Sequence, residues 1–112
     1  MRRTVLSLCV LLSVACSQRA TYPIGTTLQF DIVCVRNLWP GAPAAPLDVR
    51  EAFCRCLVQR CERRYDAEGF DRIRLALARG DYRLDAAGVP PEFRQLVAEC
   101  QSEVDRGQVK VQ

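Results

Sequence analysis

Three cysteines stand close together in FCRCLVQRC, the segment from Phe53 to Cys61. Thiols at this density can bind a metal ion, take part in thiol–disulfide exchange or form structural disulfides. The whole chain has seven cysteines and no histidine in 112 residues. Because histidine is the commonest metal ligand and general base near neutral pH, its absence narrows the chemistry open to this protein.

A metal site is disfavoured by the spacing of these cysteines. On one helix, Cys54 and Cys61 share a face, but their Cα atoms stand about 10 Å apart. Cys56 points to the opposite side of the helix, about 140–160° away from both of them. Three sulfurs placed in this way cannot meet one tetrahedral metal ion with bonds of about 2.3 Å. We therefore expect neither a metal nor another cofactor.

Thiol-redox chemistry at Cys54 and Cys56 is the alternative function. Arginines surround the pair, and nearby cations lower the pKa of a thiol. However, redox pairs usually stand at a helix N-terminus that follows a strand, and no such pattern precedes Cys54. A Cys-x-Cys pair within a helix also closes on itself with difficulty, because a disulfide needs converging side chains. The pattern favours structural cysteines in a protein that is not an enzyme.

The elements that position these cysteines read as helices in a single all-α domain over residues 26–112. Leu47 to Tyr65 is the central helix, with Phe53, Leu57 and Cys61 on its apolar stripe. Asp66 is the expected N-cap of a helix over 67–79, with Gly80 as its C-terminal cap. The last helix runs over 91–105, with these residues on its inner face: Phe93, Leu96, Val97, Cys100 and Val104.

The segment from Thr27 to Val35 is ambiguous. Its apolar residues alternate, which is typical of a strand, but the chain offers no partner strand. We therefore expect a helix, with Phe30, Val33, Cys34 and Asn37 on its inner side; the alternative is a strand that pairs with another protein. The fold expected is a small disulfide-stapled bundle of three or four helices.

Disulfides are the role best suited to these thiols. The candidates are Cys34, Cys54, Cys56, Cys61 and Cys100. A body of under 100 residues has a thin core, and each bridge adds about 2–4 kcal/mol of stability. No two of the three central cysteines pair easily with each other, so they must reach Cys34 and Cys100.

Two arrangements of these bridges remain. Cys100 lies on an inner stripe, so Cys54 or Cys61 is its expected partner. In the favoured arrangement Cys54 and Cys56 fasten the central helix to both neighbours and Cys61 is a buried thiol. In the other, Cys54 and Cys61 are paired and Cys56 is exposed.

The N-terminus has the order of a secretory signal peptide over residues 1–15. Arg2 and Arg3 precede an apolar run that ends in small residues, and the run is shorter than the roughly 20 residues of a membrane-spanning helix. Removing this leader leaves 14 basic and 13 acidic residues, which indicates little about partners. Residues 16–25 would then form a short tether.

The stretch LSVAC, which ends at Cys16, resembles the lipobox of bacterial lipoproteins. Ser13 departs from that pattern, in which a large aliphatic residue usually stands three places before the cysteine. The resemblance implies a diacylglyceryl group on Cys16, a further acyl chain such as palmitate on its amino group, and anchoring at the periplasmic face of the outer membrane. The alternative is ordinary cleavage after Ala15 and release into the periplasm.

These features together predict a non-enzymatic cell-envelope module that binds another protein. Small envelope lipoproteins often act as inhibitors, immunity factors or assembly partners, and the membrane would be contacted through lipid on Cys16. Trp39, in NLWPGAP, is a candidate partner contact, although packing beneath its loop is the favoured role. The arginines of the central helix alternate with acidic residues, so we expect a solvated face and not a nucleic-acid site.

Overall fold

The computed structural model describes residues 22–41 and 44–107, and this part of the chain contains four helices and no strand. The helices are α2 (Ile24–Asn37), α3 (Leu47–Arg64), α4 (Ala67–Arg79) and α5 (Pro91–Asp105). The prediction of a small all-α bundle is therefore confirmed, and the ambiguous segment is helical. The expected signal peptide and Cys16 lie outside the described residues.

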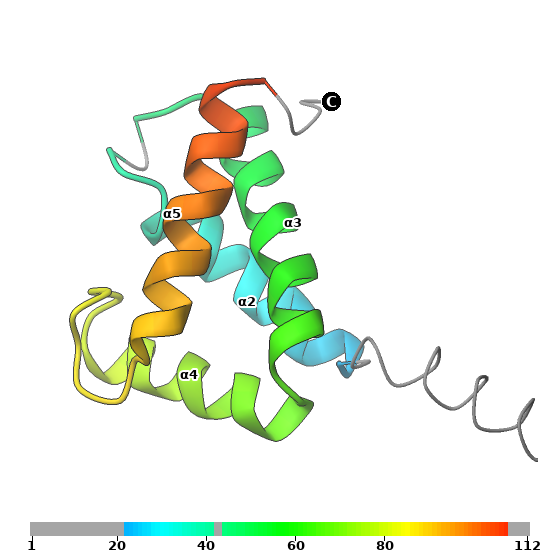
Figure 1. The fold of residues 1–112 in the computed structure, drawn as a ribbon, viewed down its shortest axis with the longest axis vertical. Helices are drawn as coiled ribbons and strands as arrows, with labels where there is room; N and C mark the ends of the chain where they lie inside the picture. Colours follow the sequence, from blue (N-terminus) through cyan, green and yellow to red (C-terminus); the bar gives the residue numbers. More distant parts are fainter. Residues whose placement is uncertain (1–21, 42–43, 108–112) are drawn as a thin grey trace, which may run out of the picture.

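The bundle is built around α3. Figure 1 shows α3 and α5 side by side in opposite directions, with α2 crossing them and α4 lying across the lower end. The contacts agree, since α3 packs against both α2 and α5. An antiparallel pair made by α3 and α5 is thus braced on one side by α2 and closed at one end by α4.

The helix boundaries follow local sequence signals. Pro23, Pro46 and Pro90 stand directly before α2, α3 and α5, each with an extended backbone at ψ of 140–149°. A proline cannot continue a preceding helix but is tolerated where a new one begins. Asp66 precedes α4, and its carboxylate accepts a hydrogen bond of 2.7 Å from the backbone N–H of Gly69, as the predicted N-cap requires.

Each helix contributes one phenylalanine to the core. Phe30, Phe53, Phe70 and Phe93 come from α2, α3, α4 and α5 in turn, and none has exposed surface. Phe30 meets Phe70 edge to face, with ring centroids 4.9 Å apart. The four side chains join the helices into one apolar cluster, whose burial is the main favourable term in folding.

The central helix is buried on more of its circumference than the sequence indicated. Its buried residues are Ala52, Phe53, Cys54, Cys56, Leu57, Val58 and Cys61. Cys56 falls on the side expected to face solvent, yet only 6% of it is exposed. Conversely, Leu47, the first residue of the helix, is 54% exposed. The physical reason is that α3 lies between two helices and buries a face against each.

The segment 16–25 was expected to be a tether, but the part of it that the structure describes belongs to the folded body. Tyr22 is only 5% exposed and belongs to the core, and α2 begins at Ile24. The ring of Tyr22 stacks on Phe70 at a centroid distance of 4.5 Å. Tyr22 is therefore part of the folded body, because this aromatic side chain packs against α4.

The inner side of α2 also differs in part from expectation. Phe30 and Cys34 are fully buried, as predicted. Val33 is half-buried, and Asn37 is exposed with its side-chain amide donating to the carbonyl of Val33. The contact face of α2 is thus narrow, which leaves much of this helix uncovered.

Candidate functional site

Two disulfides fasten α3 to its neighbours. Cys34 of α2 pairs with Cys54, and Cys56 pairs with Cys100 of α5, with Cα–Cα distances of 5.9 and 5.8 Å. Cys61 is the free cysteine of the described chain and is fully buried. In the favoured arrangement, Cys54 and Cys56 bridge to opposite neighbours and Cys61 is a buried thiol. The structure matches it in these respects.

The partner expected for Cys100 is wrong. Cys54 or Cys61 was expected to bridge to Cys100, whereas Cys56 does so and Cys54 reaches Cys34 instead. Cys54 and Cys56 point about 200° apart on a helix, so they face opposite neighbours. The error arose from assigning the apolar stripe of α3 to α5, when the Cys54 side of α3 faces α2.

The remaining thiol, Cys61, is poorly nucleophilic at neutral pH. Burial, and secondarily the negative charge of Glu62, raises the pKa of Cys61 to about 12. The nucleophilic thiolate is therefore scarce at neutral pH. Since Cys54 and Cys56 are held in two separate bridges, the described cysteines do not form the Cys54–Cys56 redox pair considered as the alternative.

Tyr22 fixes the start of the folded body to the end of α3. Its hydroxyl lies 2.7 Å from the carbonyl oxygen of Cys61 and 2.8 Å from that of Tyr65, so one donated proton is shared between two acceptors. The carbonyl of Cys61 also accepts the backbone N–H of Tyr65 at 2.8 Å, and Tyr65 directly follows Arg64, the last residue of α3. Burial raises the pKa of the Tyr22 phenol, which keeps it protonated as a donor.

Trp39 packs against the core from the loop after α2. The side chain is half-buried, and its ring meets Phe53 edge to face at 5.2 Å. This is the favoured packing role. Whether its exposed edge also contacts a partner stays a prediction.

The arginines on α3 are used in ion pairs and loop contacts. Arg60 binds Glu99 at 2.6 Å and also pairs with Glu103, so it links α3 to α5. Arg50 donates to the carbonyls of Ala45 and Val35, at 2.9 Å each, and so ties the loop between α2 and α3 to the helix. These partners explain two of the arginines without a nucleic-acid ligand.

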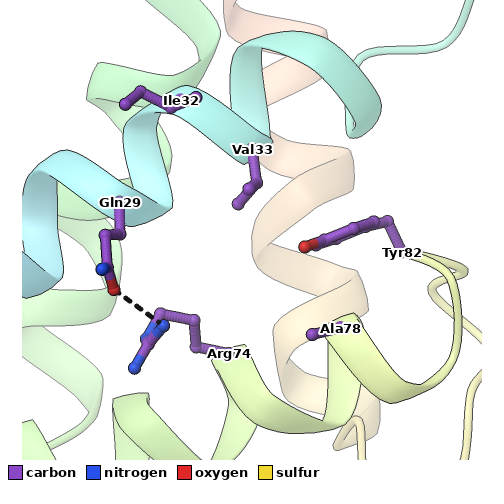
Figure 2. Close-up of a pocket in the computed structure, with 6 residues that line it drawn as sticks. All are labelled: Gln29, Ile32, Val33, Arg74, Ala78 and Tyr82. Carbon is purple, nitrogen blue, oxygen red and sulfur yellow. Dashed lines mark hydrogen bonds between the residues drawn. The ribbon is translucent and has the colours of Figure 1, made fainter.

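One concave surface lies between α2 and α4. This groove, which we call the α2–α4 groove, has a volume of about 240 Å³. Its lining residues are Gln29, Ile32, Val33, Arg74, Ala78 and Tyr82. Figure 2 shows Val33, Ala78 and Tyr82 around its apolar part, while Arg74 donates to Gln29 across it at 3.2 Å.

A strained turn places Tyr82 at this groove. Asp81 and Tyr82 follow α4 with φ of 58° and 62°, in the left-handed region that costs non-glycine residues free energy. The N–H of Tyr82 donates to the carbonyl of Leu77 at 2.7 Å, which closes the helix end. This backbone holds the ring of Tyr82 beside Ala78, as Figure 2 shows.

The groove was missed from sequence because it joins residues about 45 positions apart. One signal was available: Ile24, Leu28 and Ile32 recur at every fourth residue, and they are 78%, 58% and 53% exposed. Apolar residues at this spacing form a stripe on one side of a helix. This stripe lies on the outer face of α2 and reaches the groove at Ile32.

Residues 22–41 and 44–107 contain no group of three or more cysteine, aspartate or glutamate side chains arranged to hold a metal ion. Among the helices described, none has the length and apolarity needed to cross a bilayer.

Comparison with known proteins adds no relative. No protein-family model matches the chain, and neither the curated proteins nor the solved structures provide a match.

Proposed function

We propose that this protein is a cell-envelope lipoprotein, anchored through lipid on Cys16, whose helical body binds another protein and catalyses no reaction. The observation that carries the proposal is the α2–α4 groove, an apolar depression bordered by the exposed stripe on α2. Exposed apolar surface of this kind marks interaction sites.

The size of the groove favours a protein partner. At about 240 Å³ it is smaller than the roughly 300–1,000 Å³ typical of small-molecule sites. It is open to one or two side chains of a docking helix or loop. Arg74, held against Gln29 and Asp71, supplies a positive charge at the rim. We therefore expect the partner to insert an apolar side chain beside an acidic or polar group.

The braced body supports this function. Two disulfides hold α2 and α5 to α3, so the α2 wall of the groove is fixed to the bundle before a partner arrives. A preformed surface reduces the entropy that binding must remove. The envelope is also an oxidising compartment in which such bridges persist.

The test is photo-crosslinking in cells that export the full chain. A photoreactive amino acid replaces Ala78, which is exposed in the groove; the matched control replaces Ala98, which is exposed on α5. We expect one discrete crosslinked product from position 78 and none of that mass from position 98.

A second variant makes the test specific. Ala78→Arg fills the groove with a charged side chain and should remove the product formed by a crosslinker at Val33, whereas Ala98→Arg should leave it intact. Identical crosslinking from both positions, or no product from either groove position, would contradict the proposal. Mass spectrometry of the Cys16 peptide separately reports whether the lipid is present.

A further inference from the structure

The outer face of α2 carries an apolar stripe that no described part of the chain covers. Ile24, Leu28 and Ile32 lie within roughly 80° of one another around the helix. The buried residues Phe30 and Cys34 lie about 140° away from the centre of this stripe. Exposed fractions of 78%, 58% and 53% show that these side chains are directed away from the bundle.

The stripe is concentrated at the start of the folded body. Among the described residues, the large hydrophobic side chains with exposed surface are Ile24, Leu28, Ile32, Leu47 and Leu75. Three of the five are on α2, and the most exposed, Ile24, is the first residue of that helix. No charged residue occurs in α2 before Asp31. The first two turns of α2 thus present an uncharged face.

The chain before α2 restricts where this face can lie. Tyr22 is clamped to the carbonyls of Cys61 and Tyr65, so it cannot move away from the bundle without breaking buried contacts. Only residues 17–21 separate Tyr22 from Cys16. A fully extended chain of this length spans about 20 Å.

We propose that the stripe formed by Ile24, Leu28 and Ile32 rests in the interface of the lipid bilayer to which Cys16 is attached. This inference rests on the lipid anchor of the proposed function. Lipid on Cys16 holds Tyr22 within about 20 Å of the headgroups. Because α2 begins directly after Tyr22 and Pro23, the start of α2 lies next to them. An amphipathic helix lying in this plane buries its apolar face about 5–10 Å deep.

This seating defines how the molecule stands on the membrane. With α2 in the headgroup layer, Ile32 marks the place where the lipid-facing stripe meets the α2–α4 groove. Val33, Ala78 and Tyr82 then form the part of the groove directed away from the bilayer, open to a protein partner. The acyl chains supply the affinity, and the stripe sets the orientation.

The test uses tryptophan reporters in the full chain, expressed with export and purified from membranes. Both variants carry Trp39→Phe to remove the native fluorophore. Leu28→Trp places a reporter on the stripe, and Leu47→Trp is the control, because Leu47 is similarly exposed at 54%. Leu47 lies at the other end of α3, about 20 Å along the helix from Cys61, where Tyr22 is bound.

Each variant is reconstituted into vesicles with phosphatidylethanolamine as the main lipid and phosphatidylglycerol as the minor one, with or without lipids brominated near the headgroup. The Leu28→Trp reporter should shift its emission to shorter wavelength and lose roughly half or more of its intensity with bromine, as expected at a depth of about 5–10 Å. The Leu47→Trp reporter should change little.

Three results would overturn the seating. Both reporters could be unaffected, both could be quenched equally, or the shift at position 28 could depend on protein concentration at fixed lipid and be insensitive to bromine, which would indicate a second copy on the stripe. If mass spectrometry shows lipid on Cys16 in the same sample, the anchor stands and only the seating fails. Absence of lipid there overturns both.

Discussion

At the scale of single residues, Gly80 allows a close approach between two segments that a residue with a Cβ atom would prevent. Gly80 ends α4, but not through the left-handed conformation usual at such caps, since its φ is −97°. It is required because a Cβ atom there would lie 2.2 Å from the Cβ of Ala86. The left-handed positions fall instead on Asp81 and Tyr82. Gly80 therefore permits the close approach that folds the following turn back onto α4.

Two glycine-to-alanine substitutions test this reasoning. Gly80→Ala should lower the free energy of unfolding by about 1–3 kcal/mol, the usual cost of overpacking. Gly25→Ala is the matched control, because it lies in the first turn of α2 with no atom within 4 Å of the added Cβ. It should stabilise the protein by about 0.4–1 kcal/mol by restricting the unfolded chain. Urea unfolding measures both, and equal effects would contradict the steric explanation.

At the scale of elements, the helices are joined by two bridges that differ in span. Cys34–Cys54 closes a separation of 20 residues and Cys56–Cys100 one of 44. The bridges lie on opposite sides of α3, so each secures a different neighbour. The Arg60 pairs with Glu99 and Glu103 support the second contact, but partly exposed ion pairs contribute little.

Removing the bridges one at a time should rank them by span. In the chain-entropy model, losing Cys56–Cys100 costs about 4 kcal/mol and losing Cys34–Cys54 about 3 kcal/mol. The variants are Cys56→Ala/Cys100→Ala and Cys34→Ala/Cys54→Ala, compared by denaturant unfolding at neutral pH. A larger loss from the shorter bridge would show that native packing at Cys34 and Cys54, and not loop closure, dominates.

The helices differ in how well their buried residues could be predicted from the sequence. All five inner residues predicted for α5 are buried, because this helix buries one stripe and its period is plain. The stripe predicted for α3 is buried too, but the burial of Cys56 on the opposite side was not predicted, because α3 packs against two neighbours. The partner of Cys100 was therefore assigned wrongly. The groove depends on how α2 meets α4, and no local pattern encodes that placement.

At the scale of the whole molecule, the end of α3 couples two buried ionisable groups to the stability of the fold. Tyr22 donates to the carbonyl of Cys61, and burial raises the pKa of both side chains. The folded state therefore holds protons that the unfolded chain releases at lower pH. Both groups lie in the apolar cluster that Tyr22 forms with α3 and α4.

The pH dependence of stability follows from these shifts. The unfolded Cys61 thiol ionises near its ordinary pKa of 9.0, whereas the folded thiol keeps its proton to about 12. Unfolding then releases a proton, so the contribution of Cys61 to the free energy of unfolding is constant below about pH 9 and falls as pH rises above it. Tyr22 adds to the fall above pH 10.

Denaturation of the wild type and Cys61→Ala from pH 7 to 11 checks this expectation. The variant is expected to be less stable at every pH, because a buried sulfur is removed, but its stability should decline less steeply between pH 9 and 10. Parallel curves for the two proteins would show that Cys61 does not carry the alkaline loss.

The alternating directions of the α3 cysteines bear on how the protein matures. If the chain is exported as proposed, it emerges from its N-terminus, so Cys34 and Cys54 can react before Cys100, which lies 44 residues after Cys56, becomes available. In that interval Cys61 is the nearer competitor, only five residues away. Once α3 has formed, Cys61 points about 140° from Cys56 and its Cα lies roughly 7.5 Å further along the axis. If α3 forms early, Cys56 therefore cannot pair with Cys61 and remains available to Cys100.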